Sequence, residues 1–540
     1  MKFIAAIAAD LETSPLGTRS RLRDELAGRP VLRCTVERVL AARRITAVHV
    51  LAPTGQASEI SALLGGLPVQ VETHVGTQTP YAGLVRIGRW WGLDGWRGGI
   101  GGLCSFDEDI HIALLSALTE RTGADAVLSI PAAAPLVDPA VIDAMIGHYE
   151  TYEGTVRLTL AQAPPGLAGL VIGRTLLAEL LPTNQPPGVL LTYHPDHPLP
   201  DATGKEVCYR PAAEVIEARG RLVCDTRRSF ERVRDLIEAG GERWDAAKIG
   251  TWLSARARSY VAPVPEEIEI ELTTEDPLAA GSLMHPRGAE VGQRGPIELP
   301  AIRDLVAGVA DYDDVRIVLG GFGDPCCHPQ FGEICRLLRD SGIAAIAVRT
   351  GAAFENEAAE DALFETPVDA IEVTLDAATP ETYRRIHESD AFPAILARLE
   401  RWVTRRAARQ QARPLIVPSM VKAEETFQDL EAFYNTWQRR LGAALITGYT
   451  HRAGQRPRRA VTSTTPPKRE PCRRVFARMV VLADGSVTTC DQDFTARQTI
   501  GRLGGCSLVD LWRGDSLSAI RGKPVVDLPL CPACEEWHRP

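Results

Sequence analysis

The first half of the chain alternates between short apolar runs and stretches with helical spacing. Strand-like runs occur at residues 3–9, 47–52 and 125–130, and helical stretches occur at 38–44, at 230–238 and onward to 252. Apolar runs of this length that alternate with helices are typical of an α/β layered fold with a parallel sheet. We therefore predict one α/β domain over residues 1–260.

A segment with Pro263 and Pro265 opens a second block at residues 261–450. Strand candidates lie at 268–273, 316–320, 343–348, 370–375, 415–420 and 445–449, and helices are expected between them, for example at 331–340 and 392–409. Six successive β/α units predict a closed or partial parallel barrel. In such a fold the functional loops follow the carboxyl ends of the strands.

The last ninety residues have a different pattern. Residues 452–469 carry six Lys or Arg and no acidic residue, which predicts a solvated tether over 451–470, with a phosphate or nucleotide contact as the alternative. In the final block, 471–540, Asp484-Gly485 separates two β-rich runs, 478–482 and 486–489. An Asp-Gly pair in this position predicts a β-hairpin.

Composition narrows the classes of partner. Among 540 residues, 60 Lys and Arg face 69 Asp and Glu, a net charge of −9. An acidic chain argues against general binding to nucleic acid or to a membrane surface, and no apolar run approaches the ~20 residues that span a bilayer. The apolar start is interrupted by Asp10 and Glu12, so we interpret it as a strand. We expect a cytoplasmic protein whose partner is a small molecule or another protein.

Four of the twelve cysteines form a pattern at the C-terminus: Cys472, Cys490, and the C-x-x-C pair Cys531 and Cys534. The predicted hairpin lies between the first two and folds them toward each other. Four thiolates in a small, loop-rich domain indicate a metal site, which spacing alone leaves open between zinc and an iron–sulfur cluster. Cys506 lies in a Gly-Gly-Cys-Ser turn and is expected to be a small buried residue.

The residues around these cysteines resemble a known family. PCRRVFARMVVLADGSVTTCDQDF, IGRLGGCSLVDLWRG and LCPACEEW are similar to the SPASM/twitch domain of radical SAM enzymes. The shorter twitch form of that domain holds one auxiliary [4Fe–4S] cluster. The resemblance implies such a cluster on Cys472, Cys490, Cys531 and Cys534.

The middle block resembles the radical SAM barrel. LGGFGDP after the second strand and VTLDAATPETY after the fourth are similar to two segments that contact S-adenosylmethionine in that family. The implied cofactor-binding residues are Gly320, Gly321, Gly323, Asp324, Thr374 and Asp376. The alternatives are turn formation for the glycines and capping of the following helix for Asp324 and Asp376. The reaction centre is absent, because the loop at 274–288 has no C-x-x-x-C-x-x-C motif and no cysteine. We expect a barrel without radical catalysis, in which S-adenosylmethionine binding remains open and no catalytic residue is assigned.

The first domain resembles nucleotidyltransferases of the cytidylyltransferase and molybdenum-cofactor guanylyltransferase groups. Gly28-Arg29-Pro30, IPAAAPLVDP and the Asp225-Thr226 dipeptide carry the likeness. Such enzymes hold Mg²⁺ on two carboxylates. Asp225 occupies one position, or alternatively caps a helix, but Ala133 replaces the other and the phosphate loop keeps one glycine, Gly17. Binding of Mg²⁺ and a nucleotide is therefore doubtful.

The combination resembles the spiro-SPASM fusion family. Three functions stay open. The first is a non-catalytic iron–sulfur protein with a redox, ligand-binding or partner-binding role. The second is an S-adenosylmethionine-dependent enzyme that modifies a peptide or a nucleotide-activated sugar. The third is an active nucleotidyltransferase.

Overall fold

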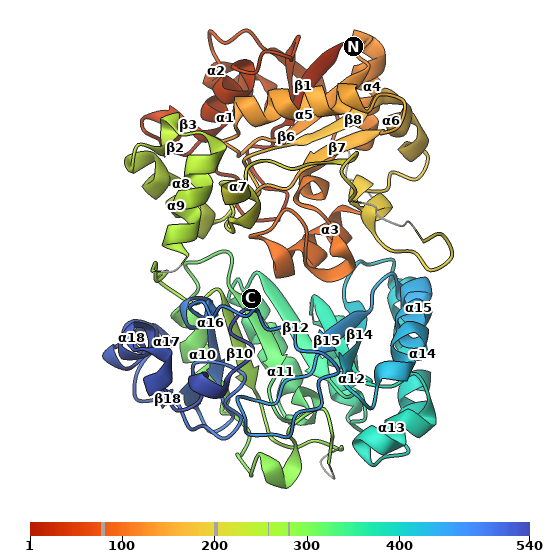
Figure 1. Ribbon diagram of the computed structural model, residues 1–540, viewed down its shortest axis with the longest axis vertical. Coiled ribbons are helices and arrows are strands. Elements are labelled where there is room, and N and C mark those ends of the chain that lie inside the picture. Colours follow the sequence, from red (N-terminus) through yellow and green to blue (C-terminus); the bar gives the residue numbers. More distant parts are fainter. Residues whose placement is uncertain (77–80, 199–202, 258, 279–280, 367, 540) are drawn as a thin grey trace. The chain divides into compact units, whose positions relative to one another are not determined.

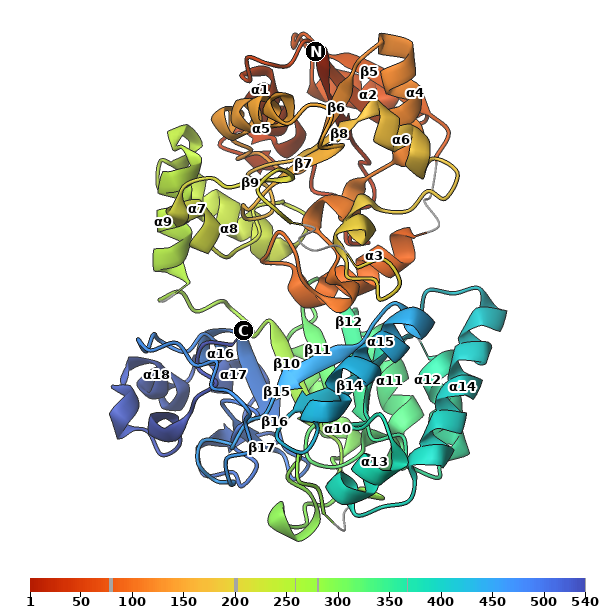
Figure 2. The same ribbon diagram turned by 45° about the vertical axis from the view of Figure 1, so that its right-hand side comes forward.

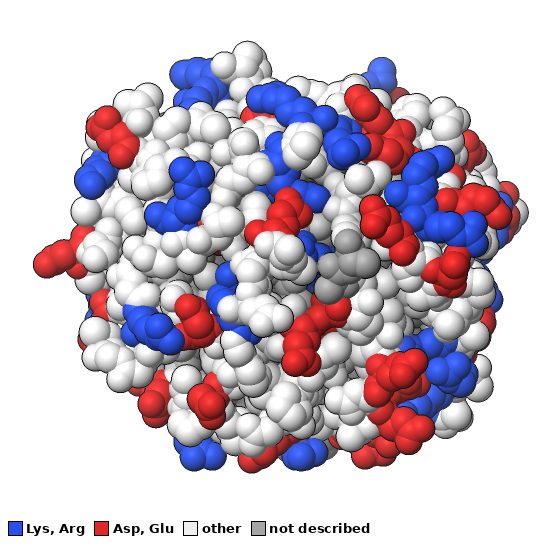
Figure 3. Space-filling model, turned by 90° about the horizontal axis from the view of Figure 1, so that it is seen from below, with Lys and Arg blue, Asp and Glu red and all other residues white. Residues whose placement is uncertain are grey.

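The computed structural model describes residues 1–540 except 77–80, 199–202, 258, 279–280, 367 and 540. The chain forms two compact units, Met1–Ser259 and Tyr260–Pro540, each built on its own sheet (Figure 1). No helix of the described part is long and apolar enough to cross a bilayer. On the face drawn in Figure 3, basic side chains are interspersed with acidic ones.

A seven-stranded sheet forms the centre of the first unit, in the order β5-β4-β1-β6-β8-β7-β9. Its strands are β1 (Phe3–Ala8), β4 (Val48–Pro53), β5 (Gln70–His74), β6 (Ala126–Pro131), β7 (Leu158–Ala161), β8 (Leu170–Gly173) and β9 (Cys208–Tyr209). A small separate ladder pairs β2 (Glu25–Leu26) with β3 (Arg29–Pro30). The three predicted strands are β1, β4 and β6, which pair in parallel.

The sequence predicts a parallel sheet, but the observed sheet is not parallel throughout. β8 runs antiparallel to both β6 and β7. The apolar runs of β7 and β8 are only four residues each, and a run that short does not reveal its direction. The N-terminal sheet is therefore mixed, with parallel pairing at β5-β4-β1-β6.

Helices cover both faces of this sheet (Figure 2). Alternate residues of β1 enter two cores, Phe3, Ala5 and Ile7 on one face and Ile4 and Ala6 on the other, which explains its continuous apolar run. The first core contains residues of α1 and α5, and the second contains residues of α4 and α6. The helices are α1 (Val31–Leu40), α2 (Ala57–Leu63), α3 (Ala82–Arg89), α4 (Ile112–Thr122), α5 (Pro139–Thr151), α6 (Arg174–Leu180), α7 (Ala213–Glu217), α8 (Arg227–Glu238) and α9 (Ala246–Arg256).

The second unit contains all six predicted strands. They pair in parallel in sequence order as β10 (Glu267–Glu271), β11 (Arg316–Gly320), β12 (Ala345–Thr350), β13 (Ala370–Thr374), β14 (Leu415–Lys422) and β15 (Leu445–Gly448). β15 is an edge strand, so the barrel is partial. The α/β class and the partial barrel are both confirmed.

The alternation of residues along these strands separates an apolar face from a polar one. Ile268, Ile270, Ile317 and Leu319 belong to the core beneath the helices. The alternate positions of β10 are all Glu, and those of β12 and β13 include Arg349 and Glu372. The helices are α10 (Leu299–Ala307), α11 (Phe331–Asp340), α12 (Glu357–Glu365), α13 (Pro380–His387), α14 (Phe392–Arg409), α15 (Leu430–Leu441), α16 (Arg474–Ala477), α17 (Leu508–Arg513) and α18 (Asp515–Gly522).

The predicted C-terminal hairpin is present and extends the same sheet. β16 (Arg478–Val481) pairs in parallel with β10, and it also pairs in antiparallel fashion with β17 (Ser486–Thr488), followed by β18 (Thr499–Arg502). The basic segment before it begins with buried ion pairs, whereas most of its residues from 457 to 469 are exposed, as a solvated tether requires. The side chains of Arg452 and Arg456 are only 13% and 8% exposed and pair with Asp491 and Glu290.

Candidate functional site

The four C-terminal cysteines surround one cavity. Cys472 lies just before α16, Cys490 follows β17, and Cys531 and Cys534 belong to a single tight turn. All four line a cavity of about 400 Å³, and all four thiols are free. The fold thus brings together the four residues that the sequence singled out.

Hydrogen bonds hold the C-x-x-C turn against the cavity. The Glu536 backbone N–H donates to Cys534 Sγ at 3.3 Å, and Gln498 Nε2 lies 4.0 Å from Cys531 Sγ. Arg469 Nη2 donates to the carbonyl oxygen of Cys531 at 2.7 Å. These contacts fix the direction of both thiols before any group binds.

Burial raises the pKa of the Cys490 and Cys531 thiols, and it raises the pKa of Cys534 to about 11. As free thiols, these three groups keep their protons at neutral pH. A metal centre binds thiolate, so its insertion releases these protons and replaces the cost of burying a charge with metal–sulfur bonds.

Four cysteines around one cavity are a suitable ligand set for two kinds of metal centre. Zinc takes four thiolates in structural sites, and iron–sulfur clusters are held by four cysteine thiolates as well. Within the described part of the chain, no three His, Cys, Asp or Glu are grouped as a preformed site for a metal ion. The cavity of about 400 Å³ is the place where the four cysteines could hold either group.

Two charged residues of this site were missed by the sequence analysis. Arg474 lines the cavity and is 8% exposed, and its Nη1 donates to Asp491 Oδ1 at 2.6 Å. Their positions in the sequence could have identified them, because Arg474 lies two residues after Cys472 and Asp491 directly follows Cys490. Cys506 corrects another expectation, because it is exposed rather than buried and does not line the cavity.

The glycines predicted to approach a cofactor approach the chain itself. A Cβ at Gly321, where φ is +88°, would lie 2.6 Å from Glu271 Cβ, and one at Gly323 would lie 2.3 Å from the Thr273 carbonyl oxygen. A Cβ at Gly320 would meet Arg349 Cβ at 3.3 Å. The glycine-rich turn therefore packs tightly on the end of β10.

Asp324 is buried and fully engaged. Its Oδ1 accepts from the Cys326 N–H at 3.0 Å, and its Oδ2 accepts from Thr350 Oγ1 at 2.6 Å and from the Gly351 N–H at 3.1 Å. Burial raises the pKa of Asp324 to about 6. These bonds tie the ends of β11 and β12 together and use both carboxylate oxygens.

Thr374 and Asp376 lie at the carboxyl end of β13. Thr374 Oγ1 donates to the Thr350 carbonyl oxygen at 3.3 Å. Asp376 Oδ2 lies 2.8 Å from His285 Nε2 and 3.5 Å from His387 Nε2, and Oδ1 accepts from the Val421 N–H at 2.7 Å. Burial opposes ionisation of Asp376, but the two histidines hold its pKa below the usual range.

His285 belongs to the loop that follows β10. The described part of this loop is held by protein contacts: Asp276 pairs with Arg287 at 3.1 Å, and Leu283 N–H donates to the Ile386 carbonyl oxygen at 3.0 Å. The buried Leu278 side chain packs on Gly351. These contacts tie the loop to the segments that follow β12 and β13.

In the N-terminal unit, Asp225 is part of a buried charge cluster. Arg221 donates to both of its carboxylate oxygens and also pairs with Glu108, which Arg89 Nε contacts at 2.8 Å. Asp225 is 1% exposed. It directly precedes the cap of α8, Thr226, so the predicted metal carboxylate is held by an arginine and is not itself the helix cap.

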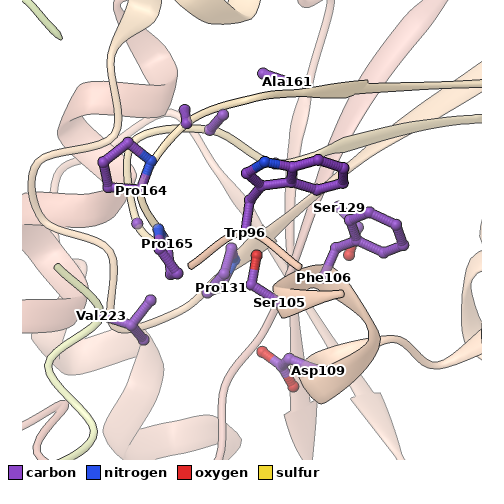
Figure 4. A pocket seen from close by; sticks show the side chains of 14 residues that line it. Trp96, Ser105, Phe106, Asp109, Ser129, Pro131, Ala161, Pro164, Pro165 and Val223 are labelled. Atoms are coloured by element: carbon purple, nitrogen blue, oxygen red, sulfur yellow. The ribbon is translucent and has the colours of Figure 1, made fainter. Parts of the chain in front are cut away.

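The region that resembles a phosphate loop is also occupied by internal contacts. Arg19 pairs with Asp24 at 2.6 Å, and a Cβ at Gly17 would lie 2.8 Å from Arg86 Nη1. Ala133 follows the end of β6. Nearby, a cavity of about 30 Å³ is bordered by Trp96, Ser105, Phe106 and Asp109, and by the prolines after β7 (Figure 4). This volume suits about two water molecules rather than a nucleotide.

Comparison with known proteins identifies the C-terminal segment. Residues 472–535 match the family model SPASM, an iron–sulfur cluster-binding domain. The match begins at Cys472 and contains the other three cavity cysteines. This match confirms the predicted iron–sulfur domain. The number and type of cluster belong to the proposal below.

One curated relative and several solved structures are similar to the chain. An uncharacterized protein of Treponema pallidum (strain Nichols) is 26% identical over 298 residues, which cover 53% of this chain and 82% of the relative. BtrN in complex with AdoMet and 2-DOIA is 15% identical, with 50% of this chain and 93% of BtrN covered and a TM-score of 0.35.

Two further solved structures are also similar to parts of the chain. SuiB of Streptococcus suis bound to S-adenosylmethionine is 11% identical, with 57% of this chain and 82% of SuiB covered and a TM-score of 0.40. A cytidylyltransferase from Leptospira borgpetersenii is 15% identical, with 47% and 95% covered and a TM-score of 0.34.

Proposed function

We propose that this chain is an iron–sulfur protein that binds one [4Fe–4S] cluster through Cys472, Cys490, Cys531 and Cys534. The protein has a redox, ligand-binding or partner-binding role and does not perform radical catalysis. The observation that carries the proposal is that four free thiols line one cavity inside the segment that matches an iron–sulfur family.

When bound, such a cluster supplies a one-electron redox couple. The chain supplies four thiolates from three separate segments, so cluster binding links residues that are far apart in sequence. Apolar side chains of Leu528, Leu530 and Trp537 line the cavity and are at most 8% exposed. They limit the access of water, which stabilises a group that is sensitive to solvent.

The contacts at the barrel edge support the absence of radical chemistry. The loop at 274–288 offers no thiolate, and His285 is bonded to Asp376. In the N-terminal unit, the pairing of Asp225 with Arg221 weighs against metal-dependent nucleotidyl transfer, because the carboxylate is already neutralised. Both features favour binding and redox roles over either enzyme reaction.

The test is metal analysis of protein purified without oxygen. Iron, acid-labile sulfide and zinc per chain are measured in the wild type, in Cys472→Ser and Cys531→Ser, and in Cys506→Ser as a matched control. We expect about four irons in the wild type and the control, and loss of iron in the other two variants. One zinc without iron would overturn the proposal. About eight irons would reveal a second cluster and contradict the assignment of a single one.

A further inference from the structure

Arg474 is a buried cation at the wall of the cysteine cavity. It lines the cavity together with Cys472 and Cys490, and only 8% of its surface is exposed. Its Nη1 is bonded to Asp491, but its Nε is buried and has no hydrogen-bond partner in the described structure. A buried N–H without a partner is costly, and because Arg474 lines the cavity, a group bound there can supply the acceptor.

A second unpartnered atom lines the same cavity. Gln498 is 6% exposed, and its Nε2 donates to Thr489 Oγ1 at 3.1 Å, whereas its Oε1 is buried without a partner. Because Gln498 Oε1 can only accept a hydrogen bond, the sulfur atoms of a cluster do not satisfy it, and the inference rests on the unpartnered donor Arg474 Nε.

Asp491 fixes the direction of Arg474. Its Oδ1 accepts from Arg474 Nη1 at 2.6 Å, and its Oδ2 accepts from Arg452 Nη1 at 3.0 Å and from Gln492 Nε2 at 3.0 Å. The carboxylate is therefore held between two arginines. Because Asp491 directly follows Cys490 and also holds Arg452, this arrangement places two positive charges and one negative charge at fixed positions beside a proposed cluster ligand, with Arg474 the one that lines the cavity.

We propose that the Arg474–Asp491 pair sets the reduction potential of the group held by the four cysteines. The inference rests on the proposed cluster. One electron makes such a group more negative, so the positive charge and free N–H of Arg474 favour the reduced state, and the negative charge of Asp491 opposes it. Arg474 and Asp491 are positioning residues here, since neither supplies a ligand to iron.

The test measures the potential of the loaded protein with an electrode and mediators, following the visible absorption of the cluster. The variants are Arg474→Gln, Arg474→Lys and Asp491→Asn, with the exposed Arg502→Gln as the control. Arg474→Gln is expected to lower the equilibrium constant for one-electron reduction about tenfold, a shift of 59 mV. Asp491→Asn is expected to shift it in the opposite direction. Arg474→Lys keeps the charge and stays closer to the wild type, and Arg502→Gln leaves the potential unchanged.

Iron content separates this inference from the proposal beneath it. If the wild type holds no iron, the proposed function itself has failed. If every variant holds the full iron content and the potentials are equal, only the role of the pair is overturned. If Arg474→Gln loses iron, the inference is tested with Asp491→Asn instead. A reduction potential of Asp491→Asn above that of the wild type supports the inference, and an unchanged potential overturns it.

Discussion

Arg221 and Asp225 form a bidentate ion pair in the core of the N-terminal unit, in which Arg221 Nε donates to Asp225 Oδ1 at 2.7 Å and Nη2 donates to Oδ2. The same guanidinium reaches Glu108, and Arg89 contacts Glu108 from the other side. Two arginines thus balance two carboxylates, and all four side chains are at most 5% exposed.

This pairing predicts that Arg221 is a stability residue. Arg221→Met leaves Asp225 and Glu108 short of a cation in a buried environment. Breaking a buried pair by removing one partner costs about 3–5 kcal/mol, so we expect a loss of this size in the free energy of unfolding. Chemical denaturation followed by circular dichroism measures it.

Arg219→Met is the matched control, because Arg219 is exposed in the same segment. We expect less than about 0.5 kcal/mol of change for that variant, as is usual for surface substitutions. If Arg221→Met were as stable as Arg219→Met, the charge cluster would not contribute to stability as described.

The elements that the sequence predicts well are those with long local patterns. The six strands of the partial barrel each have several apolar residues at strand spacing, most are followed by a helix, and all six are present. The Asp484-Gly485 hairpin forms where its turn residues indicate. The four cysteines could be grouped because thiol spacing is a strong signal on its own.

Other features depend on contacts between distant parts of the chain. β16 pairs with β10 across more than two hundred residues, and no local pattern identifies that neighbour. Glu108 lies 113 residues from Arg221, so the engagement of Asp225 was not predictable from its motif. Asp324 caps the short helix that follows it, one of the two roles the sequence allows, but its bonds to Thr350 and Gly351 join distant parts of the chain and no local pattern reveals them.

Asp324 gives a pH-dependent prediction. Burial raises its pKa from 3.8 to about 6 in the folded protein. The folded state therefore binds a proton more tightly than the unfolded state, and this contribution to stability is lost as pH rises from about 4 through about 6. A shift of about two units corresponds to about 3 kcal/mol. The Asn side chain of Asp324→Asn does not titrate, so the variant does not lose this contribution. The free energy of unfolding of the variant, relative to that of the wild type, therefore increases as the pH is raised from 4 to 7.

Denaturation at pH 4, 5, 6 and 7 measures the difference between the two proteins, and titrations shared by both cancel. The exposed Asp340→Asn serves as the control and is expected to follow the wild type across the range. A difference between Asp324→Asn and the wild type that stays constant with pH would show that Asp324 is ionised throughout and would contradict the burial argument.

The loop at 274–288 leads to a prediction about S-adenosylmethionine. Leu278 packs on Gly351, and His285 bonds to Asp376, one of the residues that the resemblance implies for cofactor binding. Binding would require these buried contacts to break. We therefore expect calorimetric titration of the metal-loaded protein to show no binding tighter than millimolar. The control variants are the near-isosteric Thr374→Val at the barrel edge and Thr404→Val at an exposed position. If the wild type binds with a dissociation constant well below a millimolar, and this binding is lost in Thr374→Val but kept in Thr404→Val, then the barrel edge does open to the cofactor and the prediction is wrong.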